Sequence, residues 1–208
     1  MPGHHHNINE EKSMEINRLS LIESAAGKPA INRRHFLKSA AGLAMFPMIA
    51  TGETDPTRLW EPMTETEEEQ VASSAMAEDI LNFAGKGYSC AESTLIVCLR
   101  FLGKPESMVH AAAYFGGGMG HRDHCGLLTG GLMGIGIAAG VLYEERTAMK
   151  TWSQEIAGEY WEWFASRAPI QCRELKTNYS DTEMYLRMAK RCACRMEMMF
   201  REAGLEKS

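Results

Sequence analysis

Residues 115–136 form the stretch FGGGMGHRDHCGLLTGGLMGIG, which divides into two halves around Cys125. The first half is a glycine hinge, residues 116–120, followed by four polar residues. Glycine reaches positive φ without strain, so this half predicts an irregular loop that other groups can approach closely. The second half is apolar and studded with glycine, and it predicts a helix that begins near Cys125.

Cys125 lies at the junction, where we expect the first turn of that helix. A thiol near a helix N-terminus meets unpaired N–H groups and the helix dipole, and both favour the thiolate. A thiolate beside a bent glycine loop suits a metal ligand or a redox-active thiol. A buried structural cysteine next to a tight turn is the competing interpretation, and this stretch alone leaves both open.

Glycines also recur at four-residue spacing within the expected helix, at Gly126, Gly130 and Gly134. Small residues at that spacing let another helix approach closely. The apolar run 127–142 spans about 16 residues, short for a bilayer crossing. We therefore interpret this segment as the buried central helix of a globular fold rather than a membrane span.

The rest of the body also predicts helices. Thr64 and Glu67 fit a capping box for a helix that ends before Gly85, and Ser89 is a suitable N-cap for a helix that carries Cys90 in its first turn. No stretch shows the alternation typical of a strand. The sequence predicts an all-α domain over residues 64–208, a compact bundle of about six helices around the glycine-rich one. Further helices are expected at about 106–114, 147–167 and 181–203, with a short piece starting at Cys172.

Six cysteines suffice for one metal site or one or two disulfides. Cys98 lies among large apolar residues and is predicted to be a core residue. In the last helix, methionines at helical spacing place Cys192 on the apolar face. Cys194 lies about 200° away around the helix, on the side of Arg191 and other basic residues, and is therefore predicted to face solvent. The remaining cysteines are Cys90, Cys125, Cys172 and Cys192, which could be four ligands, two disulfides or buried thiols.

The first 50 residues differ from the body. Arg33 and Arg34 precede Phe36, Leu37 and Lys38, and a short, weakly hydrophobic segment follows; the pattern resembles a twin-arginine export signal. It implies a periplasmic or extracytoplasmic protein, the twin-arginine machinery as a partner, and export in the folded state, often with a cofactor already loaded. The signal is expected to be cleaved near Ala50 or kept as an anchor, with residues 51–63 as a linker.

The charge and cysteine content of the chain exclude some classes of partner and cofactor. Residues 51–208 hold 16 Lys or Arg and 23 acidic residues, a net charge of −7, which argues against a nucleic-acid partner. No Cys-x-x-Cys-His motif occurs, so covalently attached haem is not expected. The aromatic face of helix 147–167, with Trp152 and Tyr160, is predicted to pack in the core or in a homodimer interface.

Several motifs together resemble one known family. They are Ser89-Cys90-Ala91, the Phe115–Gly120 run, Cys125-Gly126 with Thr129-Gly130, Cys172-Arg-Glu-Leu and a late Arg-Cys. This combination resembles the redox-active family named for its C_GCAxxG_C_C pattern, over about residues 65–203. It is also similar to the non-haem part of split-Soret cytochromes, which implies an iron–sulfur centre. Leu127 replaces the motif's alanine, and Cys194 beside Cys192 leaves the fourth cysteine position open.

The resemblance implies an electron carrier rather than a catalyst. On that hypothesis a [2Fe–2S] cluster is held by the thiolates of Cys90, Cys125, Cys172 and Cys192, and no haem is bound. The glycines expected beside the cluster are Gly116, Gly117, Gly118, Gly120 and Gly126. The redox partner protein is not identified by the sequence.

Two other hypotheses stay open. In the first, Cys125 attacks as a thiolate and Cys90 or Cys172 resolves, as in a thiol–disulfide redox protein. In the second, the cysteines hold a structural zinc ion or form disulfides in a non-catalytic module. The polar segment 121–124 could add a ligand or a proton donor, although solvation of the loop is the simpler interpretation.

Overall fold

The computed structural model describes residues 62–178 and 182–208. The chain divides into two units, Met1–Glu53 and Thr54–Ser208, and all described residues belong to the second. The twin-arginine motif, the expected cleavage position and most of the 51–63 linker lie outside the described residues.

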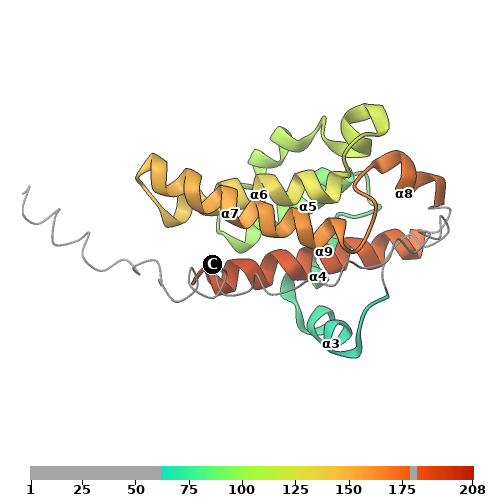
Figure 1. The fold of residues 1–208 in the computed structure, drawn as a ribbon, viewed down its shortest axis with the longest axis horizontal. Helices are drawn as coiled ribbons and strands as arrows, with labels where there is room; N and C mark the ends of the chain where they lie inside the picture. Colours follow the sequence, from blue (N-terminus) through green and yellow to red (C-terminus); the bar gives the residue numbers. More distant parts are fainter. Residues whose placement is uncertain (1–61, 179–181) are drawn as a thin grey trace, which may run out of the picture. The chain divides into compact units, whose positions relative to one another are not determined.

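Helices make up the regular structure (Figure 1). No strand occurs within residues 62–178 and 182–208, where only two isolated bridges interrupt the helical pattern, so the all-α prediction is confirmed. In chain order the elements are α3 Glu65–Ser73, α4 Ala75–Asp79, η2 Ile80–Asn82, α5 Cys90–Phe101, η3 Glu106–Ala112, η4 Gly118–Arg122, α6 Gly126–Leu142, α7 Arg146–Ala165, α8 Cys172–Asn178 and α9 Thr182–Glu202.

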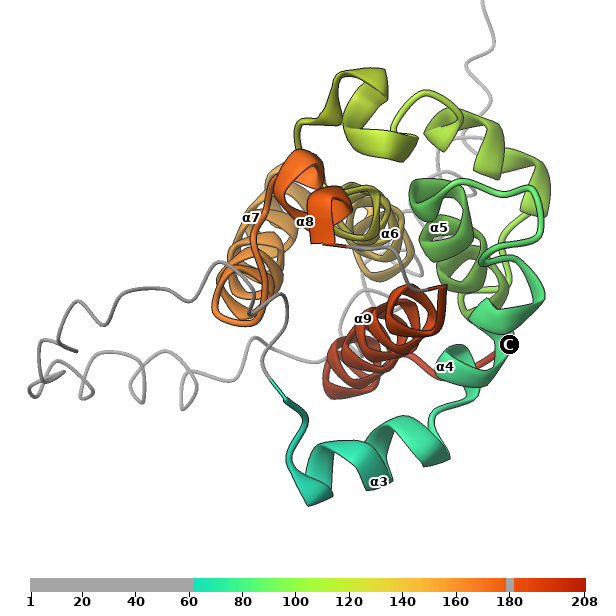
Figure 2. The ribbon, with the colours of Figure 1, turned by 90° about the vertical axis from the view of Figure 1, so that its right-hand side faces the viewer.

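Helix α6 packs against α5 and α7, and α9 packs against both α5 and α6 (Figure 2). The glycine stripe explains the close approach of α5. A Cβ atom at Gly126 would lie 2.2 Å from the Cys90 sulfur, and one at Gly130 would lie 2.5 Å from the Ala91 carbonyl oxygen. At Gly131 a Cβ atom would lie 2.4 Å from the Tyr160 ring of α7. The predicted close contact at the glycine stripe is therefore confirmed.

Helix α6 lies in the interior as predicted, with residues such as Leu128 and Ile135 fully buried. None of the described helices combines the length and the apolar character needed to cross a membrane.

Helix α9 is buried on two sides. Its apolar face, which includes Met188, Cys192 and Met196, lies in the main core as predicted. The opposite side packs against α3 and α4, where Cys194 contacts a small cluster with Val71 and Ala77. The prediction that Cys194 faces solvent is therefore wrong, because α3 and α4 cover this side and leave Cys194 only 4% exposed.

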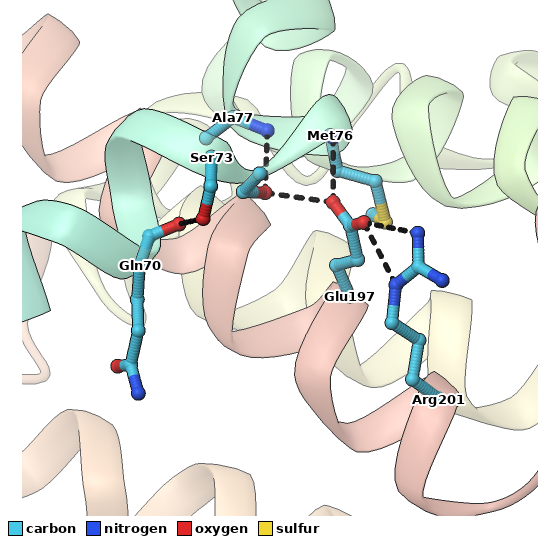
Figure 3. A network of polar contacts seen from close by, with 7 residues as sticks. Gln70, Ser73, Met76, Ala77, Glu197 and Arg201 are labelled. Carbon is cyan, nitrogen blue, oxygen red and sulfur yellow. Dashed lines mark hydrogen bonds and ion pairs between the residues drawn. The ribbon is translucent and has the colours of Figure 1, made fainter.

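Two polar contacts fix α3 and α4 to α9. The Arg191 guanidinium, also predicted on the exposed side, is buried and forms an ion pair of 2.5 Å with Glu67. The Glu197 carboxylate accepts hydrogen bonds from the Ser74 hydroxyl at 2.7 Å and the Met76 N–H at 2.8 Å, and it pairs with Arg201 (Figure 3).

The expected first helix is divided in two at Ser74. This residue has extended backbone angles, and its hydroxyl accepts the Ala77 N–H at 3.0 Å, so it ends α3 and caps α4. Thr64 caps α3 as predicted, accepting the Glu67 N–H, but the Glu67 carboxylate pairs with Arg191. The break lets α4 turn its N-terminal N–H groups toward Glu197.

Candidate thiol site

Three of the four candidate cysteines stand at the beginnings of helices. Cys90 is the first residue of α5, behind a complete capping box of Ser89 and Glu92. Cys125 is the N-cap residue of α6, one position before the predicted first turn, and Cys172 is the first residue of α8. Helix starts have well-defined backbone geometry, so the three side chains emerge from fixed positions.

A short antiparallel bridge joins two of these positions. His124 pairs with Gln171, the Cys125 N–H donates to the Ile170 carbonyl at 2.8 Å, and the Cys172 N–H donates to the Asp123 carbonyl at 2.5 Å. Side chains alternate across extended backbone, so those of Cys125 and Cys172, on either side of the bridge, lie on the same face. Diagonal neighbours of this kind are about 7–8 Å apart.

Cys90 joins them through the contact between α5 and α6. Its sulfur lies directly against Gly126, 2.2 Å from where a Cβ atom would stand. Any side chain at position 126 would displace this sulfur. Gly126, predicted to lie beside the site, therefore brings Cys90 next to Cys125.

The three cysteines line one pocket of about 300 Å³. The other lining residues are mainly apolar or aromatic: Gly85, Tyr88, Ser89, Gly117, Leu127, Leu175, Tyr185 and Met188. Cys125 and Cys172 are each 6% exposed, and Cys90 is half-buried. The pocket therefore presents sulfur atoms from three segments in a largely apolar setting.

Cys192 lies behind this pocket rather than on its wall. It is fully buried in the core and hydrogen-bonded to the hydroxyl of Tyr160, which in turn donates to the Leu127 carbonyl at 3.1 Å. A charge on Cys192 would raise the pKa of Cys125, and a charge on Cys90 would raise the pKa of Cys192. All four predicted cysteines thus gather in one region, with three on the pocket surface.

Burial controls the protonation of these thiols. It raises the pKa of Cys125 well above its usual value, and a charge on Cys90 raises it further, although the Leu127 and Leu128 N–H groups lower it. Burial raises the pKa of Cys192 to about 12, with partial compensation from Tyr160 and Arg191. The expectation that the helix N-terminus makes Cys125 a thiolate is wrong, since desolvation outweighs the N–H groups. A bound cation would favour the thiolate form of both.

The predicted glycine loop adopts an uncommon backbone. Gly117, Gly118, Met119 and Gly120 all have positive φ, at 62°, 66°, 55° and 73°, which makes a short left-handed turn. Gly117 lines the pocket, and a Cβ atom at Gly118 would lie 2.8 Å from the Cys172 Cβ and 2.4 Å from the Asp123 nitrogen. Glycine is therefore required where the loop passes Cys172.

The remaining loop residues are less central. A Cβ atom at Gly116 would lie 2.2 Å from the Ser89 Cβ, so this glycine packs the loop onto the start of α5. Gly120 is exposed, with only the Tyr114 ring near its missing Cβ, and does not line the pocket. His121 and Arg122 are exposed as well, in agreement with the interpretation of a solvated loop.

Tyr185 and Met188 were not among the predicted site residues, yet both line the pocket from α9. Burial raises the pKa of Tyr185, and charges on Cys90, Cys125 and Cys192 act in the same direction. Tyr185, Met188 and Cys192 are separated by three and four positions, the spacing of one helix face. That spacing from a candidate cysteine is the signal that would have found them.

The ligand atoms available at the pocket suit an iron–sulfur cluster, but their arrangement in this structure does not. Sulfur-only ligation is what such clusters use, and the pocket is apolar. However, in the part of the chain that the structure describes, no three His, Cys, Asp or Glu side chains are arranged to hold a metal ion, and none of the six cysteines forms a disulfide. Ligation by all four cysteines would thus require their side chains to move together.

Comparison with known proteins identifies the family of the chain. No curated protein and no solved structure matches it. Residues 88–203, more than half of the chain, match the family described as putative redox-active protein (C_GCAxxG_C_C). This range contains the three cysteines of the pocket, the glycine loop and Cys192. The chain therefore belongs to the C_GCAxxG_C_C family of putative redox-active proteins.

Proposed function

We propose that the protein is an exported electron carrier that holds an iron–sulfur cluster on Cys90, Cys125, Cys172 and Cys192. The observation that carries this proposal is that three cysteines from three separate helix starts line one apolar pocket. Cysteine thiolates are the usual ligands of such clusters.

Cys192 is a better candidate for the fourth ligand than Cys194. Its thiolate charge interacts with those of Cys90 and Cys125, and it lies in the same core. Cys194 belongs to the separate cluster against α3 and α4. Within this proposal we therefore assign the fourth ligand position to Cys192 rather than to Cys194.

The chain's own residues would set the properties of the centre. When bound, such a cluster takes up and releases single electrons at a potential that depends on burial and on hydrogen bonds to sulfur. Leu127, Leu175 and Met188 line the pocket with apolar side chains. Gly117 leaves space on the loop side, because nothing lies within 4 Å of where its Cβ atom would stand. The N–H groups of Leu127 and Leu128 favour a thiolate at Cys125.

A second candidate function is thiol–disulfide exchange, favoured by the position of the Cys90 sulfur against Gly126, the residue that follows Cys125. Cys90, after losing its proton, would attack a substrate disulfide, because it is half-buried and within reach of a substrate whereas Cys125 is buried. The attack forms a mixed disulfide and releases one substrate thiolate. Cys125, after losing its proton, then displaces the second, so that two electrons pass to the substrate and a Cys90–Cys125 disulfide remains.

Export by the twin-arginine route is part of the proposal. It is supported by Arg33 and Arg34 and the hydrophobic segment after them, which lie outside the described residues. Because that route carries folded proteins, the cluster would be inserted before export. A fusion of residues 1–60 to a reporter should reach the periplasm only when the twin-arginine machinery is present, and replacing both arginines with lysine should retain it in the cytoplasm.

The decisive test is iron and acid-labile sulfide content, with a visible spectrum, on protein purified without air. We expect about two irons per chain, for a [2Fe–2S] cluster. Cys125→Ser should lose the iron and the colour, whereas Cys98→Ala, a change at a buried cysteine outside the pocket, should keep both. Comparing Cys192→Ser with Cys194→Ser identifies the fourth ligand.

Other outcomes are equally informative. A colourless, iron-free protein that forms a Cys90–Cys125 disulfide on oxidation, detected by peptide mass spectrometry, would refute the cluster and support thiol–disulfide exchange. Stoichiometric zinc that survives purification would instead support a structural metal site.

A further inference from the structure

Tyr160 is a buried polar residue next to the site. It projects from α7 with no exposed surface, and its ring packs against Gly131, where a Cβ atom would lie 2.4 Å away. Its hydroxyl donates its one proton to the Leu127 carbonyl at 3.1 Å, so its oxygen accepts the hydrogen bond from the Cys192 thiol. One hydroxyl thus links the first turn of α6, two residues after Cys125, to a cysteine of α9.

Packing alone does not explain this hydroxyl. In an α-helix the Leu127 carbonyl already accepts the N–H group four residues further on, so it does not need a second donor. Burying a phenol hydroxyl is unfavourable unless it forms hydrogen bonds, and phenylalanine would fill the same space against Gly131 without that penalty. The contact that phenylalanine cannot supply is the one with Cys192.

We propose that Tyr160 is a positioning residue of the thiol site, whose hydroxyl fixes the Cys192 sulfur beside the first turn of α6. This part rests on the contacts above and does not require a cofactor. A second part rests on the proposed function: in the cluster-loaded protein, where Cys192 carries no proton, the hydroxyl turns its single proton from the Leu127 carbonyl to the Cys192 sulfur and donates a hydrogen bond there. Such donors stabilise the more negative, reduced form and raise the reduction potential.

The first experiment measures the reduction potential of the cluster in Tyr160→Phe. A hydrogen bond to a charged group is worth about a factor of ten in an equilibrium constant. We therefore expect the ratio of reduced to oxidised protein at a fixed potential to fall about tenfold, a negative shift of ~59 mV for one electron. Tyr143→Phe is the matched control, because that ring packs against Trp152. An unchanged potential in the loaded Tyr160→Phe protein would overturn the second part.

The second experiment needs no cluster. In full-length protein stripped of metal, the Raman S–H band of Cys192 is isolated as the difference between wild type and Cys192→Ala. We expect Tyr160→Phe to move this band to higher frequency, because the S–H group loses its partner, and Tyr143→Phe to leave it in place. A stationary band would refute the positioning role. If no cluster can be loaded, the proposed function fails, and this band alone decides the role of Tyr160.

Discussion

Replacing Gly130 with alanine tests the close packing of α5 on α6. A Cβ atom there would lie 2.5 Å from the Ala91 carbonyl oxygen and 3.0 Å from the Thr94 Cβ. The nearest atom is backbone, so no side chain can rotate to make room and the two helices must separate. Overpacking of this kind costs about 1–3 kcal/mol or more, whereas alanine in place of helical glycine recovers about 1 kcal/mol. Because the 2.5 Å contact is with backbone, the cost falls in the upper part of that range, about 2–3 kcal/mol, and we expect a net loss of about 1–2 kcal/mol.

Gly136→Ala in the same helix is the matched control. Gly136 is exposed, and nothing lies within 4 Å of its ideal Cβ position, so only the propensity gain remains. Thermal unfolding should show a lower Tm for Gly130→Ala, by about 2–8 °C, and a higher Tm for Gly136→Ala, by about 2–4 °C. If Gly130→Ala were as stable as Gly136→Ala, the helices would not pack at the distance described, and the placement of Cys90 against Gly126 would fall with it.

Two predictions concern the contacts of α9 with α3 and α4. Burial raises the pKa of Glu197, but the Met76 N–H and the other donors, including Arg201, outweigh it and hold this pKa below its usual value. The stabilisation it provides is therefore present above the unfolded-state pKa of about 4.3 and is lost as pH falls through the lower folded value. Urea denaturation should show that Glu197→Gln removes this pH dependence; an identical pH profile in the variant would contradict it. Arg191→Met should cost about 3 kcal/mol, because it leaves Glu67 partly buried without its guanidinium partner, and adding Glu67→Gln should recover much of that loss. Failure of the second change to recover stability would show that Arg191 acts through other contacts.

The sequence predicted local structure around the cysteines well where local rules decide the outcome. Ser89 indicated the start of α5, and the glycine spacing indicated which face of α6 another helix would meet. Helix phase placed Cys192 in the core. Each of these depends on residues within one or two turns of the position concerned, so tertiary packing had little opportunity to override them.

The errors arose where a second element covers a surface that local patterns describe as exposed. Cys194 and Arg191 lie on the basic side of α9, which is typical of a solvated face. Nothing in that segment shows that α3 and α4, more than 100 residues earlier in the chain, pack over it. The prediction of a thiolate at Cys125 was wrong for a similar reason. The helix N-terminus can be read from the sequence, whereas the desolvation that dominates the pKa of Cys125 depends on the assembled core.

The positions of the cysteines also determine when the site can exist. Cys90, Cys125 and Cys172 are separated by 35 and 47 residues and come from different helices, so no short segment of nascent or unfolded chain can present them together. Their convergence depends on the Gly126 contact and on the His124–Gln171 bridge, both of which form only when distant segments meet. The pocket therefore depends on contacts between distant segments, and a ligand that binds it but not the unfolded chain stabilises the fold by mass action.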